Sequence, residues 1–395
     1  MVDKFLISTV DEIKKGMVTD AYFVRTEEIL RKSGENPQVV MELFLKFFPN
    51  PDYLFGVFLG VNQIAHLLEG LPVTVNTMEE GEIFFPTEPV LSIEGNYIDF
   101  ARYETAIIGF ISFLSGIASK AARMRIAAGK KEVLSFGTRR QHPALAPSVE
   151  YASYVGGLDG VSNVLGAEYL GINPSGTMPH SLILVLGSNK KAFKYFHDYI
   201  DSSVPRIALV DTFASPVIES QEALEVLGDN LFGIRLDSKD YVEHIAEIKW
   251  IFKQKGDNNI KIYMSGGLDE YEIERLNRFV DGFGIGTRLS SAPVLDFALK
   301  IVEVNKKPMA KVGNLPGAKM VYRNNLFQDM VRLKETNFQG NYQPLLKPLL
   351  DQGKIVREKE SIQQTREKLL GKLENLPEEL KIIKNGKPYK VEFKP

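Results

Sequence analysis

The sequence predicts an α/β protein whose central feature is a parallel sheet closed into a TIM-like barrel. From about residue 131 onward, short apolar and β-prone runs alternate with longer amphipathic stretches. This alternation is typical of repeated strand–helix units, which place their strands in parallel. Several apolar runs end in a small polar cluster. A barrel gathers such clusters on one rim, whereas an open sheet concentrates them at one switch point, so closure is favoured.

Six apolar runs are the predicted strands of this barrel. They are residues 132–136, 181–185, 206–210, 231–236, 260–264 and 283–286. The stretches between them repeat apolar residues at three- and four-residue spacing, which predicts amphipathic helices that cover the sheet. We assign residues 121–295 to the barrel domain.

Residues 1–120 show no regular alternation and are predicted to form a separate domain that mixes helices and strands. Residues 40–48 and 62–71 have the apolar spacing of helices. Residues 81–97 hold two β-prone runs around two prolines, which predicts paired strands with a tight connection. Residues 106–118 are the most apolar run, but they are shorter than the roughly 20 residues that span a bilayer, so we expect a buried helix.

Residues 296–395 are Lys-rich and less patterned, and we assign them to a peripheral C-terminal domain. Residues 358–376 are expected to form a solvated helix, and Asn385-Gly386 predicts a hairpin turn.

Composition excludes several classes of protein. The chain has 395 residues, which predicts more than one folding unit, and a formal net charge of −2. This balance gives no basic surplus for a nucleic-acid backbone, so no nucleic-acid partner is expected. The absence of cysteine excludes disulfides, thiolate zinc sites and a cysteine nucleophile. The N-terminal residues lack the pattern of a secretory signal, so we expect a cytoplasmic protein with no membrane partner.

Small residues cluster after the last two predicted strands. These residues are Ser265, Gly266, Gly267, Gly284, Gly286 and Thr287. Backbone N–H groups without side chains can approach phosphate oxygens closely, and a helix that begins near Asp269 adds a favourable dipole. Barrels commonly bind phosphate in these two loops. Two ordinary tight turns are the alternative.

Charged residues end or follow three other predicted strands. They are Arg139, Arg140, Asp211, Arg235 and Asp237. Such charges are costly to bury unless they meet a ligand or one another. The fork of an arginine suits a carboxylate or phosphate, and a carboxylate suits ribose hydroxyls or magnesium. A structural ring of ion pairs at the barrel mouth is the alternative.

His180 is the histidine best placed for chemistry, because it lies among small residues directly before an apolar run. A nucleophilic or acid/base role at the rim and a packing role are both open. His66, His197 and His244 fall in predicted helices, where packing or surface roles are expected. No zinc-protease, nucleophile-elbow or P-loop motif occurs. These residues describe a phosphate-binding barrel that also handles a carboxylate and a sugar, without naming a reaction.

Eight segments together resemble the nicotinate phosphoribosyltransferase family. They are TDAYF at 19–23, EGEIFFPTEPVLSIEG at 80–95, FGTRR at 136–140, GLDGVSNVLGAEYLG at 157–171, GTMPHS at 176–181, VDTF at 210–213, IRLDS at 234–238 and MSGGLDE at 264–270. The resemblance covers roughly residues 15–325. It implies a type II phosphoribosyltransferase of NAD biosynthesis or salvage, with an N-terminal α/β sandwich-like domain, an incomplete barrel, and a homodimer or larger oligomer with shared sites.

The resemblance also implies roles for individual residues. Phe136 and the partner subunit's Tyr22 would stack on the pyridine ring, while Arg139 and Arg235 would hold its substituent. Asp211 and Asp237 would face the ribose and the magnesium-bound pyrophosphate. The remaining implied contacts are Ser162, Thr177 and Ser238 to substrate, the small-residue clusters named above to the 5-phosphate, and Lys311, Lys319 and Arg323 near the pyrophosphate. His180 matches the histidine that ATP-stimulated members phosphorylate, so ATP coupling is a hypothesis.

Charge decides which pyridine the site is expected to bind. Nicotinamide-using relatives carry an aspartate at the position of Ser162, and an aspartate would repel a carboxylate. Ser162 beside Arg139 therefore favours nicotinate over nicotinamide. Quinolinate needs further cations, which Arg140 or His142 could supply, so it ranks second. The same residues are also compatible with an aldolase or isomerase on this barrel, or with a binding protein that has no catalytic activity.

Overall fold

The computed structural model describes residues 5–256, 259–334 and 341–394. It divides into two compact units, and each is described by itself: unit 1 is Met1–Ser119 with Pro293–Pro395, and unit 2 is Lys120–Ala292. The sequence predicted a separate peripheral domain for residues 296–395. In the structure these residues belong to unit 1, because their strands complete its sheets.

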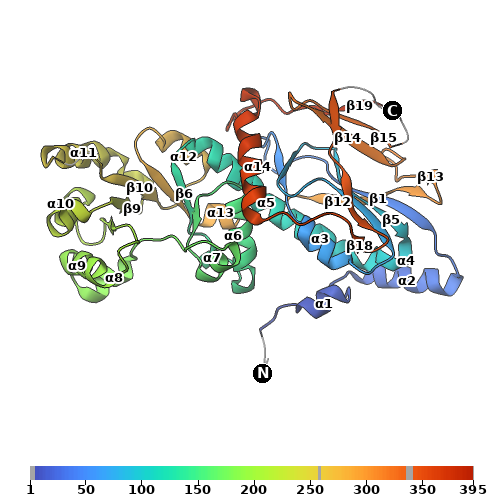
Figure 1. Cartoon of the computed structure of the whole chain (residues 1–395), viewed down its shortest axis with the longest axis horizontal. Coiled ribbons are helices and arrows are strands. Elements are labelled where there is room, and N and C mark those ends of the chain that lie inside the picture. Colours follow the sequence, from blue (N-terminus) through green and yellow to red (C-terminus); the bar gives the residue numbers. More distant parts are fainter. Residues whose placement is uncertain (1–4, 257–258, 335–340, 395) are drawn as a thin grey trace. The chain divides into compact units, whose positions relative to one another are not determined.

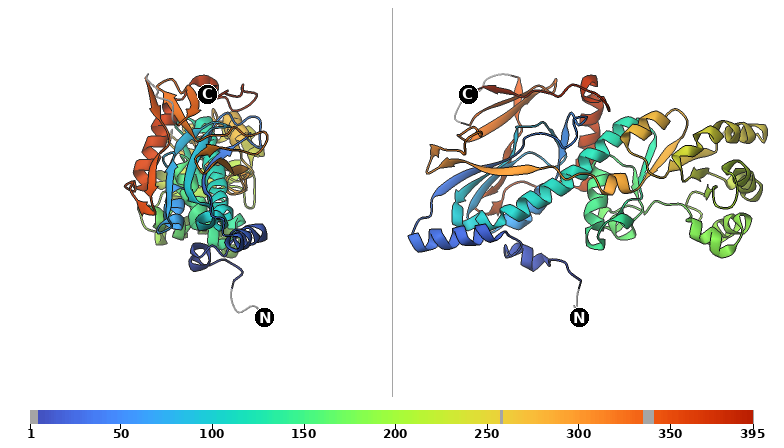
Figure 2. Two further views of the ribbon diagram at one scale, coloured as in Figure 1. Left: turned by 90° about the vertical axis from the view of Figure 1, so that its right-hand side faces the viewer. Right: turned by 180° about the vertical axis from the view of Figure 1, so that it is seen from behind.

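Unit 1 is built on a seven-stranded sheet that combines N-terminal and C-terminal strands (Figures 1 and 2). Its order is β13 (Lys307–Pro308), β12 (Phe297–Val304), β1 (Gln38–Leu45), β5 (Pro89–Asn96), β3 (Val73–Thr77), β17 (Lys347–Asp351) and β18 (Lys354–Ile355). A second sheet has the order β16 (Tyr342–Pro344), β14 (Lys319–Asn324), β15 (Asp329–Leu333) and β19 (Glu392–Lys394). Strands β2 (Gly56–Phe58) and β4 (Glu82–Phe84) form a two-stranded pair.

The helices of unit 1 cover these sheets. They are α1 (Val10–Lys14), α2 (Ala21–Ser33), α3 (Val61–Leu68), α4 (Tyr97–Phe100), the first part of α5 (Glu104–Ala128) and α14 (Ile362–Asn375). The segment Tyr97–Ala128 is long and apolar enough to cross a membrane by length and composition alone, but 61% of its most apolar window is buried. This burial agrees with the predicted core helix, which packs with the apolar residues of the main sheet.

Three local predictions in unit 1 are wrong. Residues 40–48 were predicted to be helical, but most of them form β1, whose residues are almost all buried. A continuous apolar run does not distinguish a strand covered on both faces from a buried helix. The two strands predicted around residues 81–97 exist as β4 and β5, but they pair in different sheets. Asn385 does adopt a positive φ of 60°, yet β19 pairs in parallel with β15 and forms no hairpin.

Unit 2 is a mixed α/β fold on a six-stranded parallel sheet. The order is β7 (Gly160–Val161), β6 (Glu132–Ser135), β11 (Gly282–Ile285), β10 (Lys261–Ser265), β9 (Gly233–Leu236) and β8 (Ile207–Leu209). Strands β7 and β8 are its edges, and no ladder joins them in the part of the chain that the structure describes. The parallel sheet is confirmed, and its closure into a barrel stays a prediction.

Helices follow the strands of unit 2 in the predicted alternation. They are α6 (Ala146–Val155), α7 (Val164–Leu170), α8 (His180–Leu186), α9 (Asn189–Tyr199), α10 (Pro216–Leu227), α11 (Ile245–Gln254), α12 (Glu270–Leu276) and α13 (Thr287–Ser290). Helices α8 to α11 pack in succession, each against the next (Figure 1). The loops at the carboxyl ends of the parallel strands carry polar residues.

Residues 181–185 were predicted to be a strand and instead lie in α8. The helix begins after Pro179 and ends at Gly187, which adopts a left-handed φ of 68°. Leu184 and Val185 are mostly exposed, so the run is not a buried strand. The strand that takes its place in the sheet is β7, which is only two residues long and has no apolar run to reveal it.

Candidate active site

A pocket of about 480 Å³ lies at the carboxyl ends of the strands of unit 2. Its walls come from the loops after β6, β7, β9, β10 and β11 and from the segment before α8. The lining residues are Phe136, Arg139, Arg140, Ser162, Gly176, Thr177, Met178, Pro179, Arg235, Asp237, Ser265, Gly266, Gly267, Gly284, Gly286 and Thr287. Most residues that the sequence singled out therefore meet in one place, as the carboxyl ends of parallel strands do.

Phe136 and Arg235 form one wall of this pocket. The Arg235 guanidinium lies 5.8 Å from the centre of the Phe136 ring, within reach of a cation–π contact. The backbone of Phe136 is fixed because its N–H donates to the Ile285 carbonyl at 2.7 Å. A side chain on Gly284 would lie 2.2 Å from the ring, so this glycine makes room for Phe136.

Arg235 is a half-buried cation that makes few hydrogen bonds of its own. Its Nη2 donates to the Met178 carbonyl at 3.5 Å, and its Nε has no hydrogen-bond partner among the described residues. Burial lowers the pKa of Arg235, although Asp237 and Asp211 act in the opposite direction. A half-buried guanidinium whose buried Nε has no hydrogen-bond partner is suited to an anionic ligand. Arg139 and Arg140 line the same pocket and are exposed.

The loop after β10 approaches the loop after β9 very closely. Gly266 has a φ of +93°, and a side chain there would lie 2.3 Å from the Asp237 carbonyl oxygen. Ser265 Oγ donates to Asp237 Oδ1 at 2.5 Å. Asp269 accepts the backbone N–H groups of Tyr271 and Glu272, so it caps α12. These contacts fix the backbone of the predicted phosphate loop, whose role in phosphate binding remains a prediction.

Two carboxylates and His180 form a polar cluster beside this pocket. His180 Nε2 lies 3.5 Å from Asp211 Oδ1 and 3.6 Å from Asp237 Oδ2. Asp211 Oδ2 accepts the Asp237 backbone N–H at 2.9 Å, while Asp211 Oδ1 has no hydrogen-bond partner in the described ranges. Burial is the largest cause of the raised pKa of Asp211. Among the described residues, no group of three or more His, Asp or Glu side chains is placed to hold a metal by itself.

Two predicted contacts lie outside the pocket lining. Ser238 accepts the Asp240 backbone N–H at 3.2 Å and caps the short helix that follows. His142 accepts the Ala144 backbone N–H at 3.2 Å in the same way. Both polar groups therefore have local backbone partners.

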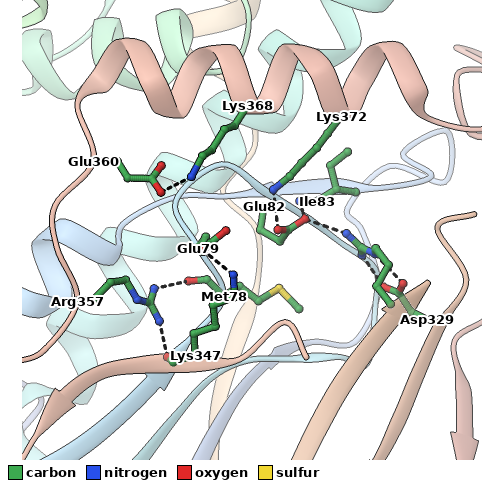
Figure 3. Close-up of polar contacts among 11 residues, drawn as sticks. Met78, Glu79, Glu82, Ile83, Asp329, Lys347, Arg357, Glu360, Lys368 and Lys372 are labelled. Carbon is green, nitrogen blue, oxygen red and sulfur yellow. Dashed lines mark hydrogen bonds and ion pairs between the residues drawn. The ribbon is translucent and has the colours of Figure 1, made fainter. Parts of the chain in front are cut away.

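The predicted pyrophosphate residues lie in unit 1, and two of them have carboxylate partners there. Lys319 is buried and contacts Glu42 at 2.8 Å. Arg323 contacts Asp329 and Glu82. Lys372 also contacts Glu82 (Figure 3). Both predicted residues, Lys319 and Arg323, therefore form ion pairs inside unit 1, and their role in binding pyrophosphate stays a prediction. Tyr22 and Lys311 line a separate pocket of about 580 Å³ in the same unit.

Sequence reasoning missed three fully buried glutamates behind the pocket loops. They are Glu150, Glu219 and Glu270. Glu150 accepts from Thr138 at 3.1 Å, and Glu270 forms ion pairs with Lys120 and Arg123. Glu219 lies on the buried stripe of α10 with Ala223 and Leu227. A carboxylate on an apolar helical stripe is the signal that could have found it.

Comparison with known proteins identifies the chain. Three family models match it: the quinolinate phosphoribosyl transferase N-terminal domain at residues 20–115, its C-terminal domain at 117–300, and the nicotinate phosphoribosyltransferase C-terminal domain at 316–395. A nicotinate phosphoribosyltransferase of Mycobacterium tuberculosis is 31% identical over 360 residues, which cover 86% of this chain and 77% of that protein. The chain belongs to the nicotinate phosphoribosyltransferase family. The resemblance seen in the sequence motifs is thereby confirmed.

Solved structures with a similar fold include two phosphoribosyltransferase-related proteins. The structure of nicotinate-nucleotide pyrophosphorylase from Pyrococcus furiosus has 45% sequence identity and a TM-score of 0.92, and covers 94% of this chain and 98% of that one. The human nicotinic acid phosphoribosyltransferase has 21% identity and a TM-score of 0.80, over 95% of this chain and 97% of that one. The human structure supports the shared fold alone. A nicotinate phosphoribosyltransferase of Dictyostelium discoideum is 34% identical over 65% of this chain and 54% of that protein.

Proposed function

We propose that this chain transfers the 5-phosphoribosyl group of phosphoribosyl pyrophosphate to nicotinate, forming nicotinate mononucleotide and pyrophosphate. The observation that carries the proposal is the wall formed by Phe136 and Arg235. The ring offers a face for a pyridine, and the guanidinium beside it offers unused donors for a carboxylate. The family and its relatives' names support the same reaction.

The transfer needs no nucleophile from the protein. The pyridine nitrogen forms a bond to C1 of the ribose while the bond from C1 to the pyrophosphate oxygen breaks, and positive charge develops on C1 and the ring oxygen. The protein must hold the two reactants in line, exclude water and stabilise this charge. Asp211 and Asp237 lie at the strand ends where the ribose hydroxyls are expected.

Magnesium fits the same two carboxylates. Asp211 Oδ1 is buried and has no hydrogen-bond partner among the described residues, and one or two carboxylates with substrate phosphates are a common donor set for this ion. Asp211 and Asp237 would hold magnesium, and the bound ion would supply positive charge to neutralise the pyrophosphate. ATP coupling, an incomplete barrel, an oligomer with shared sites and a cytoplasmic location are further parts of this proposal, and ATP coupling depends on His180.

Quinolinate is the second candidate substrate, because Arg140 lines the pocket and could hold a second carboxylate. His142 does not line it. The test mixes the protein with phosphoribosyl pyrophosphate and magnesium and measures pyrophosphate release with nicotinate, nicotinamide or quinolinate. We expect release with nicotinate, and an additional ATP arm tests coupling. Preferred turnover of quinolinate that Arg140→Ala abolishes would favour the second candidate. No release with any base would overturn the proposed reaction.

A further inference from the structure

The loop after β8 is held from behind by one buried carboxylate. Glu219 on α10 is fully buried. Its Oε2 accepts the Thr212 backbone N–H at 2.9 Å, and its Oε1 accepts those of Phe213 at 2.5 Å and Ala214 at 2.7 Å. The loop thus depends on a side chain from the following helix for the hydrogen bonds of three consecutive residues.

A carboxylate is the group that these bonds require. Both of its oxygens accept, and hydrogen bonds from N–H groups to an ionised acceptor are roughly twice as strong as neutral ones. An amide of the same shape has a single acceptor oxygen, and its NH₂ would face a backbone N–H. Three such bonds offset the cost of burying the charge, and the first turns of α10 add a favourable dipole.

The same loop carries two groups that face the polar cluster of the site. Asp211 directly precedes Thr212, whose Oγ1 lies 3.0 Å from His180 Nδ1. The other imidazole nitrogen, Nε2, is directed at Asp211 and Asp237. The orientation of the imidazole therefore depends on where the Thr212 hydroxyl lies, and that depends on the backbone that Glu219 holds.

We propose that Glu219 is a positioning residue for the transferase site: it fixes the Thr212 backbone, and Thr212 in turn orients His180 over Asp211 and Asp237. The inference rests on the proposed function and adds a residue that does not touch the substrates. It predicts a specific split in the kinetics. The nicotinate wall comes from β6 and β9, so loss of Glu219 should leave nicotinate binding nearly intact and slow turnover.

The principal test compares Glu219→Gln, Thr212→Val and the double variant with the wild type. We expect kcat to fall about 10- to 100-fold in each single variant, while KM for nicotinate changes by less than about twofold. If Glu219 acts through Thr212, the effects of the two changes should not multiply. The kcat of the double variant should then be no more than about twofold below that of the less active single variant. Glu225→Gln is the matched control, since Glu225 lies on the same helix in an exposed ion pair with Lys190.

Three results would overturn the inference. They are a loss of kcat in the double variant equal to the product of the two single losses, an equal rise in KM for nicotinate and for phosphoribosyl pyrophosphate with kcat preserved, and wild-type kinetics for Glu219→Gln. If Glu219→Gln does not fold, the pair Thr212→Val and Thr212→Ser decides, because only serine restores the hydroxyl and should recover most of kcat. Equal kcat in that pair would also overturn it.

A spectroscopic arm separates this inference from the proposed reaction. The ¹⁵N signals of the His180 imidazole, measured at one fixed pH without substrates, should shift in the same direction in Glu219→Gln and Thr212→Val and stay unchanged in Glu225→Gln. If the wild type releases no pyrophosphate but these shifts appear, the proposed function fails and the positioning role stands. If turnover is normal in the wild type and no shift appears, the positioning role fails alone.

Discussion

Arg235 in unit 2 is half-buried and Arg323 in unit 1 is buried; both lie over phenylalanine rings, yet their partners differ. Arg323 lies 5.4 Å from the Phe85 ring centre and contacts Asp329 at 2.5 Å and Glu82 at 2.9 Å. Arg235 lies 5.8 Å from the Phe136 ring centre and has one long bond to a carbonyl. Burial alone does not mark a binding site. The mark is a buried donor that has no partner, as Nε of Arg235 is among the described residues.

The pKa shifts of the two arginines express the same difference. Burial lowers the pKa of each guanidinium and is the largest single cause at both positions. At Arg323 the hydrogen bonds and charge of Asp329, followed by the charge of Glu82, outweigh burial and raise the pKa. At Arg235 the carboxylates do not compensate, and the pKa is lowered. An anionic ligand would supply the missing compensation.

The largest expected effect is the loss of stability in Arg323→Ala. This change leaves the buried carboxylates of Asp329 and Glu82 without their guanidinium, although Glu82 keeps its contact with Lys372. Loss of one partner of a buried ion pair typically costs about 3 to 5 kcal/mol. Chemical denaturation measures it, and the folded fraction should keep kcat/KM within about threefold. Arg275→Ala is the control, since Arg275 is half-exposed with one carboxylate partner and should cost under about 1 kcal/mol. Equal losses in both variants would contradict the structural role of Arg323.

Arg235→Ala should give the reverse pattern. Its guanidinium makes few bonds within the protein, so we expect stability to change by less than about 1 kcal/mol. Loss of its contact with the nicotinate carboxylate should lower kcat/KM about 100-fold, or about 2.7 kcal/mol. Steady-state kinetics measure this change in kcat/KM when nicotinate is varied at saturating phosphoribosyl pyrophosphate. Arg139→Ala, at an exposed pocket residue, is the comparison, and a larger rise in KM for nicotinate there would move the carboxylate contact to Arg139.

Glu104 tests whether an incompletely paired charge in unit 1 also costs stability. Burial, only partly offset by Lys300, raises its pKa from 4.5 to about 7. The folded protein therefore holds this proton more tightly than the unfolded chain, so the stabilising contribution of Glu104 is fully present below pH 4.5 and is lost as the pH rises towards 7. Glu104→Gln should remove this decline, which is about 2 kcal/mol after allowance for partial exposure. Urea denaturation at about pH 5 and about pH 8 measures it; an unchanged pH dependence would contradict the assignment, and the exposed Glu28→Gln is the control.

The sequence predicted the rim residues well because their placement follows from the parallel sheet. Once β6, β9, β10 and β11 are recognised as apolar runs, their carboxyl ends must meet, which brings Phe136, Arg235, Asp237 and Gly266 together. Arg323 could not be told from Arg235 in this way. Its partners lie at positions 82 and 329, and only the paired sheets of unit 1 bring them to it.

Length and local context explain the other misses. β7 is two residues long, so it has no hydrophobic pattern to detect. The apolar run in α8 is five residues long, and a run of that length is compatible with either a strand or a helix. In the sequence Glu219 is an ordinary helical glutamate. Its partners are three backbone N–H groups, and only the folded loop brings them to its carboxylate.

Gly284→Ala is expected to have the smallest effect and tests the Phe136 wall directly. The added methyl group would lie 2.2 Å from the Phe136 ring, so the ring must move. If that ring stacks on the pyridine, KM for nicotinate should rise about tenfold, or about 1.4 kcal/mol, while KM for the donor changes little. Gly286→Ala is the matched comparison, because nothing lies within 4 Å of its added methyl group. Gly286 belongs to the predicted phosphate loops, so any effect of this change should be on KM for phosphoribosyl pyrophosphate. The same KM pattern in both variants would separate Phe136 from nicotinate binding, and the unused donors of Arg235 would then need a different ligand.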